Sequence, residues 1–330
     1  MMLNLKPAPW NVPLAEDGFA RHVRACNNIR LPADRISLWI GPGASGPASG
    51  GPASVDPGSG GPASGGHASC DPGWIGAQRV GWMAPAIAAA LSGRQEFRAS
   101  PEGLLLTDPA ALRGISRELS QQGLFRWRDE AFDVRRMVDG PVLAQVDRGA
   151  LPSFGIQAQG VHVNGLVNGP NGLSVWVARR AQDKALDPGK LDHVVAGGVP
   201  AGLGPMQTLI KEAGEEASIP ADLASRAAPV GVIRYAMLRP EGLRRDVLTC
   251  YDLELPPHFE PVAADGEVEA FELWPIERVV ETVRDTDAFK FNVNLVLIDL
   301  FIRRGLIDGE EANALAAALM GTNEQGSGLG

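Results

Sequence analysis

The stretch from Gln207 to Ile219, QTLIKEAGEEASI, decides the fold. Together with the preceding Met206, its apolar residues recur at spacings of three and four, which predicts an amphipathic helix. One face of this helix then carries a continuous apolar stripe that can pack against a core. The stripe consists of Met206, Leu209, Ile210, Ala213 and Ala217.

Three acidic residues, Glu212, Glu215 and Glu216, fall together on another face of the same helix. Side chains spaced in this way lie about 5–6 Å apart, and like charges at that spacing repel. A divalent cation would relieve the repulsion, and oxygen-only ligands suit magnesium or manganese. A solvated acidic face is the alternative. The glycine-rich AGGVPAGLG at 196–204 favours the metal site, because such a turn can approach a phosphate or offer a carbonyl to a metal.

Strand patterns dominate the chain on both sides of this helix. Two β-rich runs, 161–168 and 173–180, flank the turn sequence GPNG, which predicts a hairpin. Further strands are expected at 228–239, 246–256 and 266–274, and further helices at 275–285 and 292–307. A strand-rich body with a few helices predicts the α+β class, and no dinucleotide-binding glycine fingerprint follows any of the strands.

The length of 330 residues favours two domains. We predict a small α+β domain at 1–150, a second domain at 151–308, and a C-terminal helix with a flexible tail at 309–330. Residues 41–73 consist almost entirely of Gly, Pro, Ala and Ser. Such a segment buries too little apolar surface to offset its ordering entropy, so a disordered insertion is expected there.

Composition narrows the classes of partner. The formal net charge of -9 argues against nucleic acid and anionic membranes, although a bound cation would still admit a small anionic substrate. The sequence predicts no membrane-spanning stretch and no signal segment. Three scattered cysteines, Cys26, Cys70 and Cys250, show no spacing typical of zinc or redox sites. These features predict a cytoplasmic protein with free thiols; the oligomeric state stays open.

Gly197, Lys211, Glu212, Glu215 and Glu216 are in register with the Nudix box, G-x5-E-x7-R-E-U-x-E-E-x-G-U, where U is a bulky aliphatic residue. The chain therefore resembles the Nudix hydrolases. It departs from the box at four positions, where the pattern has Glu, Arg, a bulky aliphatic residue and Gly. These positions hold Leu203, Lys211, Ala213 and Ser218.

The flanking runs sharpen this resemblance. VHVNGLV, the stretch from Val175 to Gly198, and FKFNVNLVLIDLFIRRGLI near the end look like the Nudix subfamily related to the N-terminal part of fungal thiamine pyrophosphokinase. The resemblance implies an α/β/α sandwich with a mixed sheet, preceded by an extra N-terminal domain. It also implies hydrolysis of a diphosphate linkage, with thiamine diphosphate or its oxidised analogues as the substrate class.

The resemblance also implies roles for individual residues. Glu212 and Glu216 would bind Mg²⁺ or Mn²⁺ directly, Glu215 would support them or hold a second ion, and the carbonyl of Gly197 would complete the set. The bound ion would position and activate a water for attack on phosphorus. A catalytic base is expected from Glu267, with Glu269 as the neighbouring candidate, although both can equally be exposed strand-edge charges.

Four basic residues before the box are candidates for binding the substrate diphosphate: Arg179, Arg180, Lys184 and Lys190. Arginine can bind phosphate oxygens through two parallel hydrogen bonds and lysine as a point charge. Trp176 and Tyr235 could stack on a ring, and His193 could contact phosphate. A structural role is the alternative for these last three residues.

Two functions remain open on the sequence. The first is a metal-dependent diphosphohydrolase acting on a small-molecule diphosphate, favoured because the glutamate trio is intact. The second is a catalytically degenerate module that binds a diphosphate ligand or a protein partner, favoured by the departures at Leu203 and Lys211.

Overall fold

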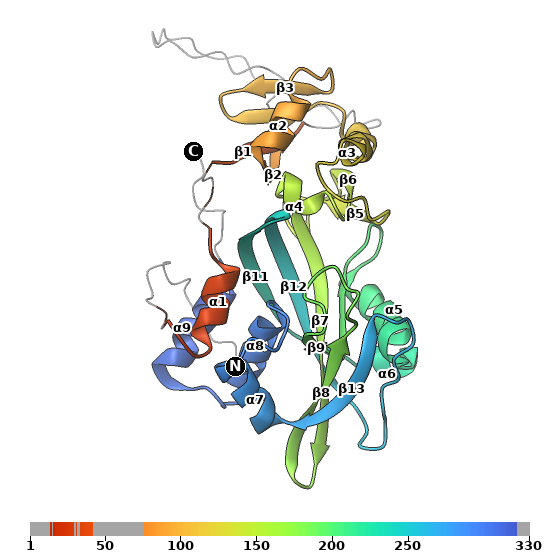
Figure 1. Ribbon diagram of the computed structural model, residues 1–330, viewed down its shortest axis with the longest axis vertical. Coiled ribbons are helices and arrows are strands. Elements are labelled where there is room, and N and C mark those ends of the chain that lie inside the picture. The colour runs from red at the N-terminus through yellow and green to blue at the C-terminus, as the bar shows by residue number, and fades with distance from the viewer. Residues whose placement is uncertain (1–13, 15, 30, 32–33, 42–75, 322–330) are drawn as a thin grey trace, which may run out of the picture.

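The computed structural model describes residues 14, 16–29, 31, 34–41 and 76–321. A four-stranded sheet lies at one end of its long axis, a larger helix-covered sheet lies at the other, and a two-stranded hairpin lies between them (Figure 1). Apart from Gly41, the predicted insertion at 41–73 falls outside the described residues, and so do residues 322–330 of the predicted tail.

The smaller sheet belongs to the N-terminal part of the chain and has the strand order β2-β1-β4-β3. Two helices pack on it around the fully buried Leu38, Leu106 and Leu112. Asp108 caps the second helix, accepting a hydrogen bond from the Ala110 N–H at 3.2 Å. The first turn of that helix is 3-10, and the α-helix begins at Leu112. The elements are β1 (Ile36–Ile40), β2 (Gln78–Met83), α2 (Pro85–Leu91), β3 (Phe97–Ser100), β4 (Gly103–Leu106) and α3 (Leu112–Gln121).

A short hairpin and a short helix connect this part to the larger sheet. Phe132 of the hairpin and the fully buried Phe154 of the helix pack into the core of the N-terminal part. Gly155 follows the helix with a left-handed φ of 57°, and a Cβ there would lie 2.2 Å from the Trp82 carbonyl oxygen, so glycine is required. The elements are β5 (Ala131–Val134), β6 (Ala144–Asp147) and α4 (Leu151–Phe154).

The larger sheet is mixed, with the order β11-β12-β7-β8-β13 and with β10 and β9 paired to β7 and β8. β12 and β7 run parallel, whereas the other neighbours are antiparallel. The predicted hairpin is confirmed, with Gly169 and Gly172 paired at its turn. The strands are β7 (Gln157–Gly169), β8 (Gly172–Arg180), β9 (Leu191–His193), β10 (Val195–Gly198), β11 (Ala228–Arg239), β12 (Gly242–Glu254) and β13 (Val268–Pro275).

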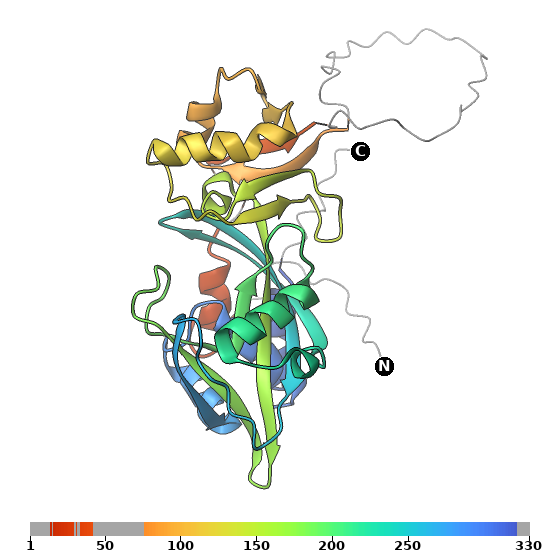
Figure 2. The ribbon, with the colours of Figure 1, turned by 90° about the vertical axis from the view of Figure 1, so that its right-hand side faces the viewer.

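Helices cover both faces of this sheet, as Figures 1 and 2 show. Val161 and Val163 of β7 face one core with α5 and α6, whereas Leu166 faces the other core with the remaining helices. This alternation along the strand builds an α/β/α sandwich and confirms the predicted α+β class. The helices are α5 (Pro205–Ala217) and α6 (Ala221–Ala224) on one face, and α1 (Ala20–Cys26), α7 (Ile276–Asp285), α8 (Val293–Arg303) and α9 (Gly309–Leu319) on the other.

The position of α1 differs from the sequence expectation. The predicted boundary at 150 assigns Ala20–Cys26 to the N-terminal domain, whereas these residues pack in the sandwich core. Phe19 and Phe301 of α8 contact each other with ring centroids 5.9 Å apart. Arg21 donates hydrogen bonds to carbonyl groups at the end of α7. Apolar surface on α8 and α9 is therefore covered by a segment from the start of the described chain.

Local chemistry fixes both ends of α5, the helix predicted first. Pro205 occupies its first position, and the Gly204 N–H donates to Oε1 of Gln207 at 2.9 Å. The helix ends at Ser218, whose φ of 53° is left-handed. Glycine adopts that conformation most easily, which explains why the Nudix pattern has glycine at this position. The Ser218 hydroxyl donates to the Val262 carbonyl at 3.0 Å and so anchors the turn.

Candidate active site

The carboxylates of α5 converge on the backbone of β10. The Ala196 N–H donates to Oε2 of Glu216 at 3.1 Å. A Cβ at Gly197 would lie 2.6 Å from Cγ of Glu212, so a larger residue there would displace this side chain. The structure therefore brings Glu212 and Glu216 together beside Gly197, the third predicted metal ligand.

Burial makes the charges of these carboxylates costly. Glu216 is only 8% exposed, and burial raises its pKa to about 8 against the opposing effect of the Ala196 N–H. Burial also raises the pKa of Glu212, while the neighbouring Lys211 opposes that rise. Metal binding displaces protons from such groups and supplies the missing positive charge. Two carboxylates beside a glycine backbone thus fit Mg²⁺ or Mn²⁺.

Glu215 lies apart from the other two glutamates. Its side chain is 52% exposed and forms an i,i+4 ion pair with Lys211. The Lys211 ammonium also lies 3.3 Å from Oε1 of Glu212. The like-charge repulsion expected along this face is therefore offset by a lysine of the same helix, and the structure gives Glu215 an outer position.

Leu203 lies in the loop before α5. It lines a cavity of about 200 Å³ together with Asp133, Arg135 and Gln159. Its aliphatic side chain cannot bind a cation, so the donor set beside β10 is smaller than the one that the Nudix pattern provides. The cavity lies between this loop and the hairpin β5–β6 of the N-terminal part.

Glu267 lies just before β13 and forms an ion pair with Lys184. Although burial favours a higher value, its pKa is lowered by the hydrogen bond from Lys184 and by nearby positive charges. Its own negative charge contributes to the raised pKa of Glu216, so it acts electrostatically on the α5 carboxylates. Glu269 accepts a hydrogen bond from the Gln182 N–H at 3.1 Å and ties β13 to that loop.

Three of the four predicted substrate-binding cations, Arg179, Arg180 and Lys190, occupy two different places. Arg179 and Lys190 line a cavity of about 490 Å³ with Arg278 of α7. Val175 and Val177, which share the parity of Arg179 on β8, belong to the core opposite α5. The structure thus does not bring Arg179 and Lys190 together with the glutamates.

Arg180 has the opposite parity on β8, and its side chain is 12% exposed. Its Nη1 lies 2.7 Å from Oδ2 of Asp192, and the ammonium of Lys290 lies 3.4 Å from the same oxygen. The negative charge of Asp192 also contributes to the raised pKa of Glu216. The two aromatic candidates are core residues: Trp176 is 8% exposed, and the buried Tyr235 donates its hydroxyl hydrogen to Asp246.

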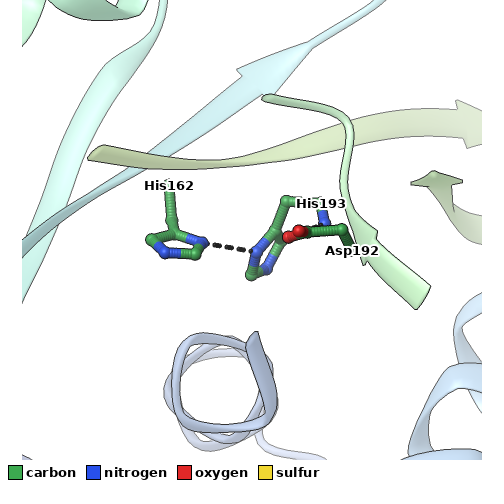
Figure 3. A group of neighbouring side chains, drawn as sticks. All are labelled: His162, Asp192 and His193. Carbon is green, nitrogen blue, oxygen red and sulfur yellow. Dashed lines mark hydrogen bonds between the residues drawn. The ribbon is translucent and has the colours of Figure 1, made fainter. Parts of the chain in front are cut away.

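The sequence analysis missed a buried group formed by His162, Asp192 and His193 (Figure 3). The two Nδ1 atoms lie 3.0 Å apart, so one imidazole donates to the other. Asn292, which precedes the first residue of α8, places its side-chain nitrogen 3.3 Å from Nε2 of His162. Metal-ligating atoms of the three residues lie within 4.8 Å of one another. Two cations already neutralise Asp192, however, and hold its pKa below its usual range against burial.

Burial lowers the pKa of His193 to about 4 and that of His162 well below its usual value. The unfolded chain, with a histidine pKa near 6.5, therefore takes up these protons first as the pH falls. Stability is lost as the pH drops from about 6.5 toward 4, at up to about 1.4 kcal/mol per pH unit for each histidine.

Replacing His193 with asparagine keeps a polar partner for His162 and removes one of these protonations. The free energy of unfolding of the wild type minus that of His193→Asn should therefore decrease by about 1–2 kcal/mol between pH 7 and pH 5. Urea unfolding at both pH values measures this change. The exposed His258 supplies the control, because His258→Asn should keep the wild-type pH dependence. A constant gap for His193→Asn would contradict the expectation.

Comparisons with known proteins cover the two parts of the chain separately. Residues 63–158 match a family described as a domain of unknown function, DUF4743. A solved structure of the NUDIX domain of Shewanella oneidensis NrtR, complexed with ADP ribose, covers 47% of this chain and 92% of its own. The identity is 14% and the TM-score 0.37, which is too low to support a statement about function. None of the described helices has the length and apolar character needed to cross a membrane.

Two curated relatives come from Arabidopsis thaliana. Nudix hydrolase 24, chloroplastic, is 43% identical over 188 residues, which are 57% of this chain and 52% of the relative. Nudix hydrolase 20, chloroplastic, is 42% identical over 206 residues, 62% of this chain and 55% of the relative. The chain thus spans about half the length of each. Over these residues the chain is similar to two proteins named as Nudix hydrolases.

Proposed function

We propose that this chain hydrolyses the diphosphate linkage of a small organic diphosphate with the help of a divalent metal ion. The observation that carries the proposal is the convergence of Glu212 and Glu216 on β10, where Glu216 accepts from the Ala196 N–H and Glu212 lies against Gly197. Sequence identity of 43% to a relative named as a Nudix hydrolase supports the same class of reaction.

The roles proposed for the residues follow from their positions. Glu212, Glu216 and the Gly197 carbonyl would hold the ion, and Glu215 would contribute from the outer side of α5. A magnesium or manganese ion bound there would withdraw charge from the diphosphate and lower the pKa of a bound water. Glu267 takes up the proton of the attacking water. The ion pair with Lys184 holds the Glu267 carboxylate in place for this role.

Thiamine diphosphate and its oxidised analogues are the proposed substrates. The support for them is the resemblance of the flanking runs to the Nudix part of fungal thiamine pyrophosphokinase. Of the four predicted cations, Arg180 and Lys184 are the proposed diphosphate-binding residues, whereas Arg179 and Lys190 line a cavity on the other face of the sheet. Among these four, Lys184 has the most direct link to the site, through its ion pair with Glu267.

The test is phosphate release from a panel of organic diphosphates, with and without Mg²⁺ or Mn²⁺. The panel includes thiamine diphosphate, its oxidised analogues and nucleoside diphosphates. Metal-dependent release from at least one thiamine diphosphate analogue is expected. Phosphate release that is equal with and without metal would reject the metal dependence. Release only from compounds other than the thiamine diphosphate analogues would reject the substrate class.

A second candidate function rests on Lys211 and Leu203. The Lys211 ammonium already pairs with Glu215 and lies 3.3 Å from Glu212, while Leu203 cannot bind a cation. These contacts favour a module that binds a diphosphate without turnover. Thermal stabilisation by the panel without any metal-stimulated phosphate release would support this candidate over the hydrolase.

A further inference from the structure

The hairpin β5–β6 of the N-terminal part packs on the loop that joins β10 to α5 (Figure 1). The Ala201 N–H donates to the Ala131 carbonyl at 2.7 Å, and the Gly202 N–H donates to Oδ2 of Asp133 at 3.3 Å. A Cβ at Gly198 would lie 2.7 Å from Cζ of Phe132. The hairpin therefore holds the loop next to the predicted metal ligands.

Asp147 fixes the open end of this hairpin. Its fully buried carboxylate accepts hydrogen bonds from three backbone N–H groups, those of Arg128 at 2.9 Å, Glu130 at 3.1 Å and Gly149 at 2.8 Å. The close approach at Gly149 requires glycine, because a Cβ would lie 1.9 Å from the Arg126 carbonyl oxygen. The residues on either side of Asp147 are thus held on a rigid frame.

Two charged side chains extend from this frame, Glu130 before β5 and Arg148 after β6. Nη1 of Arg148 lies 2.8 Å from Oε2 of Glu130, and the Arg148 N–H donates to the Glu130 carbonyl. The guanidinium lies 6.0 Å from the ring centroid of Phe132, the ring that packs on Gly198. The Arg148 side chain is 53% exposed, so solvent and ligands can reach it.

Arg148 therefore lies beside the Phe132 ring that packs on Gly198, the neighbour of the predicted metal ligand Gly197. It reaches this position although it belongs to the N-terminal part of the chain.

We propose that Arg148 is a substrate-binding residue, supplied by the N-terminal part, that binds phosphate oxygens of the diphosphate held at Glu212 and Glu216. The inference rests on the proposed function. A diphosphate brings several negative charges into a site that already contains carboxylates, so it needs cations from outside α5. A guanidinium has five N–H donors in a planar fork and can contact Glu130 and phosphate oxygens together.

If Arg148 has only a structural role, its replacement should have different effects on stability and on diphosphate binding. Half-exposed ion pairs contribute only about 0–1 kcal/mol to stability, so losing the pair with Glu130 should change the unfolding free energy little. Diphosphate affinity would then be unaffected. Binding and stability measured on the same variants therefore separate a ligand contact from a surface ion pair.

The experiment titrates methylenediphosphonate, a diphosphate that cannot be hydrolysed, into the full chain by calorimetry in the presence of Mg²⁺. We expect Arg148→Ala to weaken binding about 10-fold or more, the usual effect of losing a charged hydrogen bond. Arg148→Lys should recover part of the affinity, since it keeps the charge without the fork. Arg226→Ala, which removes an exposed arginine paired with Asp222 on α6, is the matched control and should bind like the wild type.

Wild-type affinity in Arg148→Ala, an equal loss in Arg226→Ala, or no binding by the wild type would overturn the inference. The unfolding midpoint of each variant shows whether it folds normally. If Arg148→Ala has a folding defect, the affinity of Arg148→Lys for methylenediphosphonate tests the inference instead. Hydrolysis of the substrate panel is scored separately. Arg148-dependent binding without hydrolysis would reject the proposed function alone, whereas hydrolysis with an unchanged KM in Arg148→Ala would reject this inference alone.

Discussion

Glu216→Gln is expected to reduce metal-dependent phosphate release about 100-fold or more, because it removes a proposed direct ligand of the ion. Glutamine has nearly the same volume, so the packing around this buried side chain is kept. Its amide can still accept the hydrogen bond from the Ala196 N–H. The loss should therefore appear in the rate constant and in metal affinity, with little change in the unfolding midpoint.

Glu215→Gln provides the comparison for this variant. Glu215 is half-exposed and paired with Lys211, so we expect its replacement to cost much less than that of Glu216. Rates are measured at saturating metal with the best substrate of the panel. Equal losses in the two variants would mean that the outer position of Glu215 does not reflect its role, and an unchanged rate in Glu216→Gln would reject the metal site.

The second large effect is expected at Gly197. In Gly197→Ala the new Cβ would lie 2.6 Å from Cγ and 2.8 Å from Cδ of Glu212, so the carboxylate must move. Overpacking of this kind typically costs about 1–3 kcal/mol of stability. We also expect a loss of hydrolysis comparable to that of a ligand deletion, because the displaced side chain is a proposed ligand.

Gly214→Ala, on the same helix, is the matched control. A Cβ at Gly214 would meet no atom within 4 Å, and the residue is exposed. Alanine in a helix interior is favoured over glycine by about 0.5–1 kcal/mol, so this variant should be more stable and fully active. Urea unfolding and phosphate release measure both outcomes. An active, stable Gly197→Ala would show that Glu212 does not need its present position.

Much of the sandwich is predictable from local patterns. The stripe on α5 packs as expected, with Leu209, Ala213 and Ala217 fully buried. GPNG between two β-rich runs forms the turn between β7 and β8. These features depend on residues a few positions apart, and the periodicity of side chains along a helix or strand determines them directly.

The surroundings of the site could not be predicted in this way. Asp192 and Lys290 are 98 residues apart in sequence and meet where Phe289 forms a β-bridge with Leu191 of β9. Arg179 and Arg180 are adjacent in sequence but point to opposite faces of the sheet, which composition cannot distinguish. The one local signal was the polar pair Asp192–His193 at the start of an otherwise apolar run.

The packing of α1 has a consequence for the order in which the chain can fold. Ala20–Cys26 leaves the ribosome long before α8 and α9, which cover it in the sandwich. The four-stranded sheet is made in between and has a core of its own. During synthesis this sheet can form before α8 and α9, which cover α1, have been made. Closure of the sandwich core is therefore a late, long-range event, and a fragment that starts after residue 150 would leave α8 and α9 partly uncovered.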